Sequence, residues 1–205
     1  MRAWLTAMVL SVLAVLIGGA VPCSADSQDG RIRAKVGILV QSGDRVKRAK
    51  SIDRLQSGDL LRIYVHPESR CYIYVIHTDK QTVTLLNLVE QRIQSSTLVL
   101  PSIQEFYQVD GKSATEAFTI ICSPGELKEL SALTDSKVSF EKWAALEKDL
   151  MERSRIDLDQ AGDEKPFAIA GNVRGGAGSD RFLDKLPIFS GKSLLVKRYE
   201  FQVAK

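Results

Sequence analysis

The chain has little histidine or cysteine and no large surplus of either charge. Among its 205 residues are 2 histidines and 3 cysteines, and none of them is spaced like a pair of metal ligands, so the sequence predicts no metal site. The 28 basic and 25 acidic residues leave a formal net charge of only +3. This excludes the strong positive field that is typical of nucleic-acid-binding proteins. We therefore expect no cofactor and no nucleic-acid partner.

Catalytic motifs are also missing from the sequence. No serine stands in the pattern of a nucleophile elbow. Residues 174–179 (RGGAGS) lack the Gly-Lys-Ser/Thr ending of a phosphate-binding loop, so we expect a flexible loop there. His66 and His77 fall in or beside predicted strands with acidic residues nearby, which leaves a hydrolase using His66 or His77 as a less favoured alternative. The sequence favours a protein that is not an enzyme.

The first 25 residues resemble a secretory signal peptide. A positively charged start precedes the uncharged, mostly apolar residues 3–22, and small residues at Cys23 and Ala25 fit cleavage after Ala25. We therefore expect a periplasmic or secreted protein that begins at Asp26. One alternative is an uncleaved leader that anchors the protein to the inner membrane, because the run is long enough to span it. Another is a lipoprotein acylated on Cys23, which Pro22 disfavours.

Cleavage of the leader would leave two cysteines, Cys71 and Cys122, in an oxidising compartment. Two such cysteines can form a disulfide if their Cα atoms lie within about 7 Å of each other. The sequence does not fix that distance. A disulfide and a pair of small buried hydrophobic residues are therefore both open alternatives.

Turn signals about every ten residues separate short runs that are rich in β-branched and aromatic residues. This spacing predicts a mainly β fold, an antiparallel β-sandwich with one or two appended α-helices and a C-terminal strand. We expect strands over residues 33–40, 60–66, 71–77, 82–88, 98–100, 105–109, 116–122 and 194–203.

Residues 55–79 (LQSGDLLRIYVHPESRCYIYVIHTD) predict a β-hairpin, with two apolar runs split by a turn that contains Pro67. Along the second run, alternate side chains share a face. One face carries Tyr72, Tyr74 and Ile76, and the other carries Cys71, Ile73, Val75 and His77. Because both faces are largely apolar, we expect a central strand that is covered on both sides.

Residues 45–50 contain four basic side chains, Arg45, Lys47, Arg48 and Lys50. A nucleic-acid patch would need aromatic partners and a larger basic surplus, and neither is present. Lysine and arginine commonly protect exposed strands from pairing with other chains. We therefore expect a solvated sheet edge in this part of the chain.

The hydrophobic period changes to that of helices after Cys122. Ser123 fits the N-cap of a short helix that carries leucines 127, 130 and 133, and residues 139–152 present one apolar stripe that includes Trp143 and Leu150. We expect this stripe to dock on the sandwich. The predicted organisation is a signal peptide at 1–25, a sandwich at 26–125, a helical extension at 126–158, and a flexible loop with the closing strand at 159–205.

Two segments, 55–65 (LQSGDLLRIYV) and 71–77 (CYIYVIH), together resemble the bacterial domain-of-unknown-function family 4384. The later parts of that pattern are residues 83–87, 98–101 and 116–123, with Ala114-Thr115 standing where the family has glycine. The resemblance extends over roughly residues 50–125. It implies a small β-domain of bacterial signalling or cell-surface proteins with no established activity, and it supplies no catalytic residues.

We therefore expect an exported, non-catalytic binding or interaction module of the bacterial cell envelope. Its partner would be an unknown envelope protein or an extracellular ligand, and only an uncleaved leader would place it in a membrane. The candidate contact surface lies on the turns around residues 68–70 and 78–81, with Tyr72 and Tyr74 nearby unless these pack in the core. The candidate binding residues are Glu68, Arg70, Tyr72, Tyr74 and Asp79.

A second hypothesis makes the protein a structural accessory subunit of an envelope complex. The helix at 139–152 would then be the partner face. An exposed apolar stripe on this helix would favour the second hypothesis, and a buried stripe would remove its main support.

Overall fold

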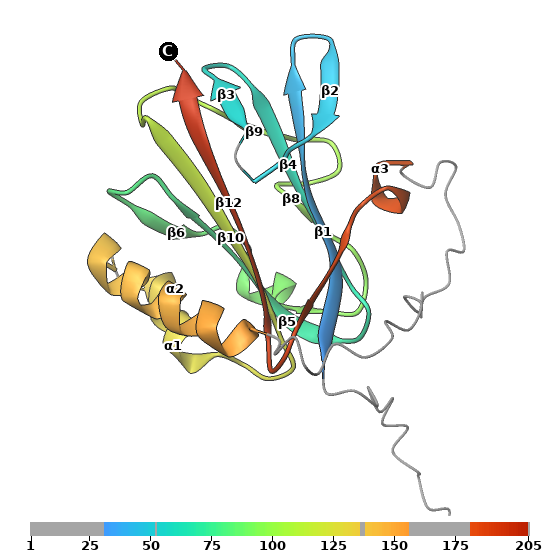
Figure 1. The fold of residues 1–205 in the computed structure, drawn as a ribbon, viewed down its shortest axis with the longest axis vertical. Helices are drawn as coiled ribbons and strands as arrows, with labels where there is room; N and C mark the ends of the chain where they lie inside the picture. Colours follow the sequence, from blue (N-terminus) through green and yellow to red (C-terminus); the bar gives the residue numbers. More distant parts are fainter. Residues whose placement is uncertain (1–30, 52, 136–137, 156–180, 205) are drawn as a thin grey trace, which may run out of the picture.

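The computed structural model describes residues 31–51, 53–135, 138–155 and 181–204 (Figure 1). Two six-stranded sheets face each other. The predicted leader and the predicted loop at 174–179 lie outside the described residues. Within the described ranges, no helix combines the length and the apolar character needed to cross a membrane.

The first sheet has its strands in the order β11, β1, β4, β8, with β2 paired to β1 and β9 paired to β4. Its strands are β1 (Ile32–Ser42), β2 (Arg45–Arg48), β4 (Leu60–Pro67), β8 (Leu98–Leu100), β9 (Tyr107–Gln108) and β11 (Ile188–Gly191). All of its pairings are antiparallel.

The second sheet has its strands in the order β3, β12, β10, β5, β6, with β7 paired to β5. Its strands are β3 (Arg54–Gln56), β5 (Cys71–Thr78), β6 (Val83–Leu85), β7 (Ile93–Gln94), β10 (Thr115–Ser123) and β12 (Leu195–Ala204). Only the pairing of β3 with β12 is parallel. The predicted closing strand is therefore an internal strand of this sheet, and the predicted fold class of a mainly β sandwich is confirmed.

The main core lies between the two sheets, where every second residue of each strand points inward. From the first sheet, β1 and β4 contribute Val36, Ile38, Val40, Ile63 and Val65. From the second sheet, β5 and β10 contribute Cys71, Ile73, Val75, Phe118, Ile120 and Cys122. Each sheet thus covers one apolar face of the other.

The predicted hairpin over residues 55–79 is wrong, because β4 and β5 belong to different sheets. Between them, Glu68 donates its backbone N–H to the carbonyl of Arg33 on β1, at 2.9 Å. The turn sequence Pro-Glu-Ser-Arg contains neither the glycine nor the asparagine that tight hairpin turns require for positive φ angles. The chain therefore crosses from one sheet to the other at this turn.

The prediction that the second run forms a central strand is confirmed by the position of β5 between β10 and β6. Its residues Ile73 and Val75 lie in the core between the sheets. Its residues Tyr74 and Ile76 lie on the opposite face, in a second core beneath the helices. Both faces are apolar because each is covered by a separate layer.

Two helices, α1 (Lys128–Asp135) and α2 (Phe140–Ser154), cover the outer face of the second sheet (Figure 1). Ser139 caps α2 by accepting a hydrogen bond from the backbone N–H of Lys142 at 3.4 Å. Trp143 and Leu150 are fully buried in the second core, so the predicted docking of the apolar stripe is confirmed. The predicted cap at Ser123 is wrong, since Ser123 ends β10 and α1 begins later.

Short segments complete the fold. The 3₁₀ helix η1 (Val89–Gln91) lies between β6 and β7, and α3 (Arg181–Asp184) precedes β11. A small apolar cluster on the outer face of the first sheet joins Leu39 and Tyr64 to Leu186. Both sheets therefore carry some apolar cover on their outer faces.

Candidate functional site

The inward-facing rows of β5 and β10 each end in a polar side chain. On β5 the row runs through Cys71, Ile73 and Val75 to His77. On β10 it runs through Cys122, Ile120 and Phe118 to Glu116. Apolar side chains fill the other positions of both rows, so the layer between the sheets changes from apolar to polar where His77 and Glu116 lie.

A cavity of about 350 Å³ opens at this end of the sandwich, and both sheets contribute to it. We call it the His77 pocket. Its apolar lining consists of Leu61, Leu86, Val109 and Phe118. Its titratable or hydroxyl-bearing side chains are His77, Asp79, Tyr107, Asp110, Lys112, Ser113 and Glu116. An apolar lining with a few convergent polar groups is typical of small-molecule sites.

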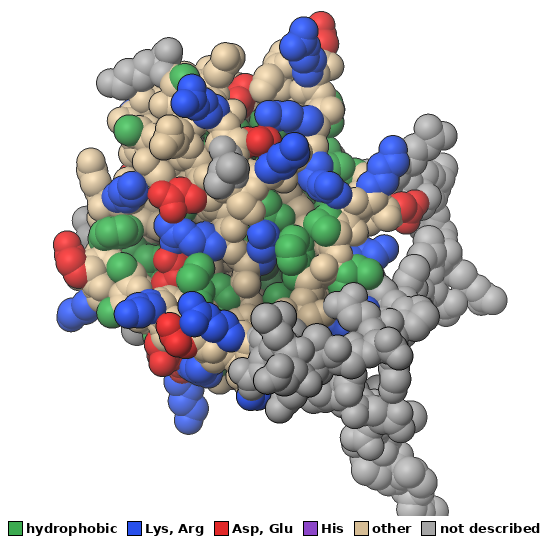
Figure 2. Space-filling view, viewed as in Figure 1, with side chains coloured by type: hydrophobic (Ala, Val, Ile, Leu, Met, Phe, Trp, Pro, Cys, Tyr) green, Lys and Arg blue, Asp and Glu red, His purple; other side chains and the backbone are tan. Residues whose placement is uncertain are grey.

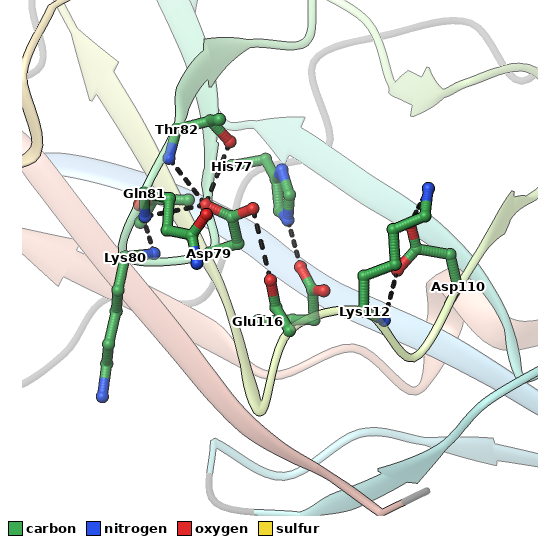
Figure 3. A network of polar contacts seen from close by, with 10 residues as sticks. His77, Asp79, Lys80, Gln81, Thr82, Asp110, Lys112 and Glu116 are labelled. Atoms are coloured by element: carbon green, nitrogen blue, oxygen red, sulfur yellow. Dashed lines mark hydrogen bonds and ion pairs between the residues drawn. The ribbon is translucent and has the colours of Figure 1, made fainter.

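His77 and Glu116 form a direct polar pair in this pocket, shown in Figure 3. The His77 Nε2 atom is hydrogen-bonded to the carboxylate of Glu116. The imidazole also packs against the ring of Phe118, with centroids 5.0 Å apart. Because the side chain of Glu116 is only 11% exposed, the pair lies at the inner end of the polar region.

Asp79 is held in the turn after β5 by four donated hydrogen bonds (Figure 3). Its Oδ1 atom accepts from the backbone N–H of Gln81 at 2.9 Å and from the backbone and hydroxyl of Thr82 at 2.6 and 3.0 Å. Its Oδ2 atom accepts from the hydroxyl of Ser113 at 3.3 Å. Burial acts to raise the pKa of Asp79, but these donors outweigh it and lower the pKa below its ordinary value. Asp79 is therefore anionic at neutral pH.

The opposite rim carries an exposed ion pair between Lys112 and Asp110, with 3.0 Å between Nζ and Oδ2. Burial raises the pKa of Tyr107, so its hydroxyl is protonated at neutral pH. Three carboxyl groups and one ammonium group thus line the pocket. This balance favours ligands that donate hydrogen bonds or carry positive charge.

The contacts of the pocket do not form a nucleophile and base. Ser113 donates its hydroxyl to Asp79, while His77 is bonded to Glu116. A serine nucleophile needs a hydrogen bond to its base, and this arrangement lacks one. No group of three or more His, Cys, Asp or Glu side chains that suits a metal ion occurs in the described part of the chain.

Of the predicted binding residues, Asp79 alone lines the pocket. Glu68 and Arg70 lie in the turn before β5, and Asp79 follows its far end. Strands advance about 3.3 Å per residue, so the nine residues from Arg70 to Asp79 put the two turns roughly 30 Å apart. Glu68 is paired with Arg33 at 3.2 Å, and Arg70 is exposed. The two turns therefore do not form one contact surface.

The two predicted tyrosines lie on the helix-facing side of β5. Tyr74 is fully buried, and its hydroxyl accepts a hydrogen bond from the backbone N–H of Leu127 at 2.9 Å. The prediction of Tyr74 as a binding residue is therefore wrong, and its alternative as a core residue is confirmed. Tyr72 is half-buried against the same core.

The two histidines considered for catalysis lie in different sheets. His66 is on β4, where its Nδ1 atom lies 2.9 Å from the hydroxyl of Thr97. Burial and then the charge of Lys35 lower the pKa of His66. His66 does not line the His77 pocket, so the two histidines do not act in one site.

Cys71 and Cys122 are free, buried thiols in the core between the sheets. The disulfide alternative is not formed, and the two residues pack as small hydrophobic side chains. Contact with the Cys71 thiol, together with burial, holds the pKa of Cys122 well above its ordinary value. Cys122 is therefore a protonated, unreactive thiol.

Several pocket residues were not predicted from the sequence, above all Glu116, Lys112 and Ser113. The inward orientation of Glu116 could have been predicted, because alternation along the predicted strand places it on the same face as Phe118. Lys112 and Ser113 follow the turn at Gly111, and only the folded chain brings that turn beside Asp79.

No family model matches the chain, and no match was found among curated proteins or solved structures. The resemblance to domain-of-unknown-function family 4384 stays a prediction from the sequence. The geometry of the His77 pocket is consequently the main basis for a function.

Proposed function

We propose that the protein is an exported, non-catalytic binding module of the bacterial cell envelope. Its site is the His77 pocket, and its ligand is a small molecule with an amine at one end and an apolar part at the other. The observation that supports this most strongly is the placement of His77 and Glu116 at inward-facing positions of β5 and β10. Polar groups at core positions cost stability, so a binding role accounts for their presence.

The charges of the pocket support an amine as the polar part of the ligand. Asp79 and Glu116 lie on one side, and Asp110 lies near the rim with its partner Lys112. A protonated amine can donate up to three hydrogen bonds to such carboxylates, whereas a ligand carboxylate would be repelled. The ordered position of Asp79, held by Thr82 and Gln81, means that this acceptor needs little rearrangement on binding.

The apolar lining and the volume support a small ligand. Leu61, Leu86 and Phe118 provide apolar contacts in the pocket. Ligand pockets in proteins commonly measure about 300–1,000 Å³. At about 350 Å³ the His77 pocket belongs at the small end of that range and suits a ligand the size of a single amino acid or an arylalkylamine.

The hydrogen bonds of Ser113 and His77 support a non-catalytic role. Ser113 is bonded to Asp79 and His77 is bonded to Glu116, so the serine hydroxyl is not paired with the histidine that would serve as its base. The envelope location is supported by the leader-like residues 1–25 and by the resemblance over residues 50–125. The accessory-subunit hypothesis loses its main support, because Trp143 and Leu150 on α2 are buried.

Titration calorimetry with a matched pair of probes tests the proposed binding. Phenethylamine and 3-phenylpropionate have similar shapes and opposite charges. We expect the amine to bind and the carboxylate not to bind. In Glu116→Gln the affinity for the amine should fall about tenfold or more, because a hydrogen bond to a charged acceptor contributes about 1.5–3 kcal/mol.

The matched control is Glu90→Gln, an exposed carboxylate on η1 outside the pocket. This variant should bind phenethylamine like the unaltered protein. Equal binding of both probes, or an equal loss of affinity in both variants, would contradict the proposed site. Circular dichroism of each variant shows whether the fold is retained.

Export has its own test. The N-terminal sequence of protein purified from the periplasm should begin at Asp26. An intact leader on the purified protein would refute cleavage and would favour the anchored alternative.

A further inference from the structure

The strand β2 forms an exposed edge of the first sheet. Its four residues, RVKR, are all exposed, and among the described strands it pairs with β1 alone. Residues of β2 line a groove of about 1170 Å³ that reaches to β3, the edge strand of the second sheet. This groove and the His77 pocket share no lining residue.

The backbone of β2 has groups that are free to pair with another strand. In the register of β1 and β2, Val40 lies opposite Lys47, and Ala49 donates its N–H to the carbonyl of Ile38 at 2.8 Å. Hydrogen-bonded positions alternate along an antiparallel pair. Lys47 therefore turns its backbone groups toward β1, while Val46 and Arg48 turn theirs outward.

The side chains around this edge are strongly basic. Residues 44–54 contain two acidic residues, Asp44 and Asp53, and five basic residues, Arg45, Lys47, Arg48, Lys50 and Arg54. The groove lining adds one further carboxyl group, that of the buried Asp59. Basic side chains gather over the end of the molecule where Figure 1 places β2 and β3, as Figure 2 shows.

Two of these basic side chains already form contacts within the protein. Lys47 pairs with Asp53 at 3.2 Å, and Arg48 donates to the carbonyl of Lys185 at 2.7 Å. Arg45 and Arg54 both line the groove and take part in none of the ion pairs found between described residues. They are the charges that a bound anionic group would meet.

We propose that the β2 edge docks an extended acidic segment of a partner protein, which adds a strand to the first sheet. Outward backbone groups at Val46 and Arg48 would form the ladder, as in other cases of strand addition. The side chain of Val46, 59% exposed, offers an apolar contact between the basic positions. Like charges oppose pairing of this edge with the same edge of a second copy, so the basic side chains select an acidic strand and disfavour self-association.

A short synthetic peptide of alternating glutamate and valine is the probe, and the same peptide with lysine in place of glutamate is its control. Fluorescence anisotropy on the full chain measures binding, and amide hydrogen exchange locates it. We expect the acidic peptide to bind, with slower exchange at the amides of Val46 and Arg48, and the basic peptide not to bind.

Two variants separate the backbone from the charges. Val46→Pro removes an outward N–H without removing a bond to β1 and should weaken binding about tenfold. Arg45→Glu with Arg54→Glu should abolish binding, whereas Lys148→Glu on the exposed face of α2 should leave it unchanged. If Val46→Pro does not fold, the amide exchange of the unaltered protein decides the question.

Several outcomes would overturn the proposal. Equal binding of the two peptides would exclude charge selection. Binding without protection at Val46 and Arg48, or equally tight binding of the anionic polysaccharide heparin, would show a general polyanion surface and no strand addition. None of these results bears on the His77 pocket, whose amine binding is measured separately.

Discussion

The carboxylate of Glu116 on β10 is hydrogen-bonded to Nε2 of His77 on β5, in the row of side chains that faces the space between the sheets. In the register of these strands His77 lies opposite Phe118, so Glu116 reaches it diagonally. The pair thus occupies positions that would complete the core if they were apolar. A partly buried polar pair of this kind adds little stability compared with well-packed apolar residues.

Replacing both members of this pair should separate stability from binding. The double variant His77→Leu, Glu116→Leu is expected to be as stable as the unaltered protein or about 1 kcal/mol more stable, because apolar side chains would complete the core. Glu116→Leu alone should cost about 1–2 kcal/mol, because it leaves His77 without its partner. Urea denaturation gives the free energy of unfolding of each. A double variant less stable than the single one would show that the pair is primarily structural.

The low pKa of Asp79 predicts a pH-dependent contribution to stability. Burial opposes this low pKa, but hydrogen bonds from Thr82, Gln81 and Ser113 stabilise the anion in the folded chain. The contribution is therefore present above the pKa of the unfolded chain, about 3.8, and is lost as the pH falls through the lower folded-state pKa. At neutral pH, Asp79→Ala should lower the free energy of unfolding by about 1–2 kcal/mol.

The measurement for Asp79 is urea denaturation of both proteins over a series of pH values from neutral to acid. The difference between them should shrink as the pH falls below about 4, because protonation removes the acceptor in the unaltered protein as well. A difference that stays constant over this range would mean that the hydrogen bonds do not depend on the charge of Asp79.

Trp143 should be a determinant of stability and not of binding. Its side chain projects from α2 and is fully buried in the second core, and its indole Nε1 finds no hydrogen-bond partner among the described residues. Trp143→Ala should cost about 3–5 kcal/mol through the cavity that it leaves. Trp143→Phe keeps most of the apolar contact and removes an unsatisfied donor, so it should cost only about 1 kcal/mol. Equal losses in the two variants, measured by urea denaturation, would contradict this packing.

The two buried thiols should resist modification in the folded protein. Cys71 and Cys122 lie in the core, and the raised pKa of Cys122 suppresses its reactive thiolate. Iodoacetamide should modify neither residue before denaturation and both residues after it, as peptide mass mapping would show. Peptides joined through Cys71 and Cys122 under non-reducing conditions would mean that a disulfide forms between these two residues.

Most of the layer structure could be predicted from local patterns. Apolar residues on both faces of β5 indicated a central strand, and the stripe with Trp143 and Leu150 indicated a helix with one buried face. The assignment of strands to sheets could not be predicted in this way. Two apolar faces show that a strand is covered on both sides, but they do not show which strand lies beside it. The pairing of β10 with β12 joins segments far apart in sequence and has no local signal.

The site was predictable only in part for the same reason. Asp79 and His77 stand out in the sequence, as a turn residue and as a polar end to an apolar row. Glu116 was recognisable by alternation, but its contact with His77 depends on the pairing of β5 with β10. Tyr74 looked like a binding residue because tyrosine is common at contact surfaces, and the backbone N–H of Leu127 instead satisfies its hydroxyl inside the fold.

Chemical-shift mapping tests the proposed ligand site most directly. Isotope-labelled protein is titrated with phenethylamine, and the amide resonances that move are assigned. We expect the largest changes at His77, Asp79, Ser113 and Glu116, and their loss in the Glu116→Gln variant. Changes confined to the β2 edge or to the face of α2, or no saturable change at all, would contradict binding in the His77 pocket.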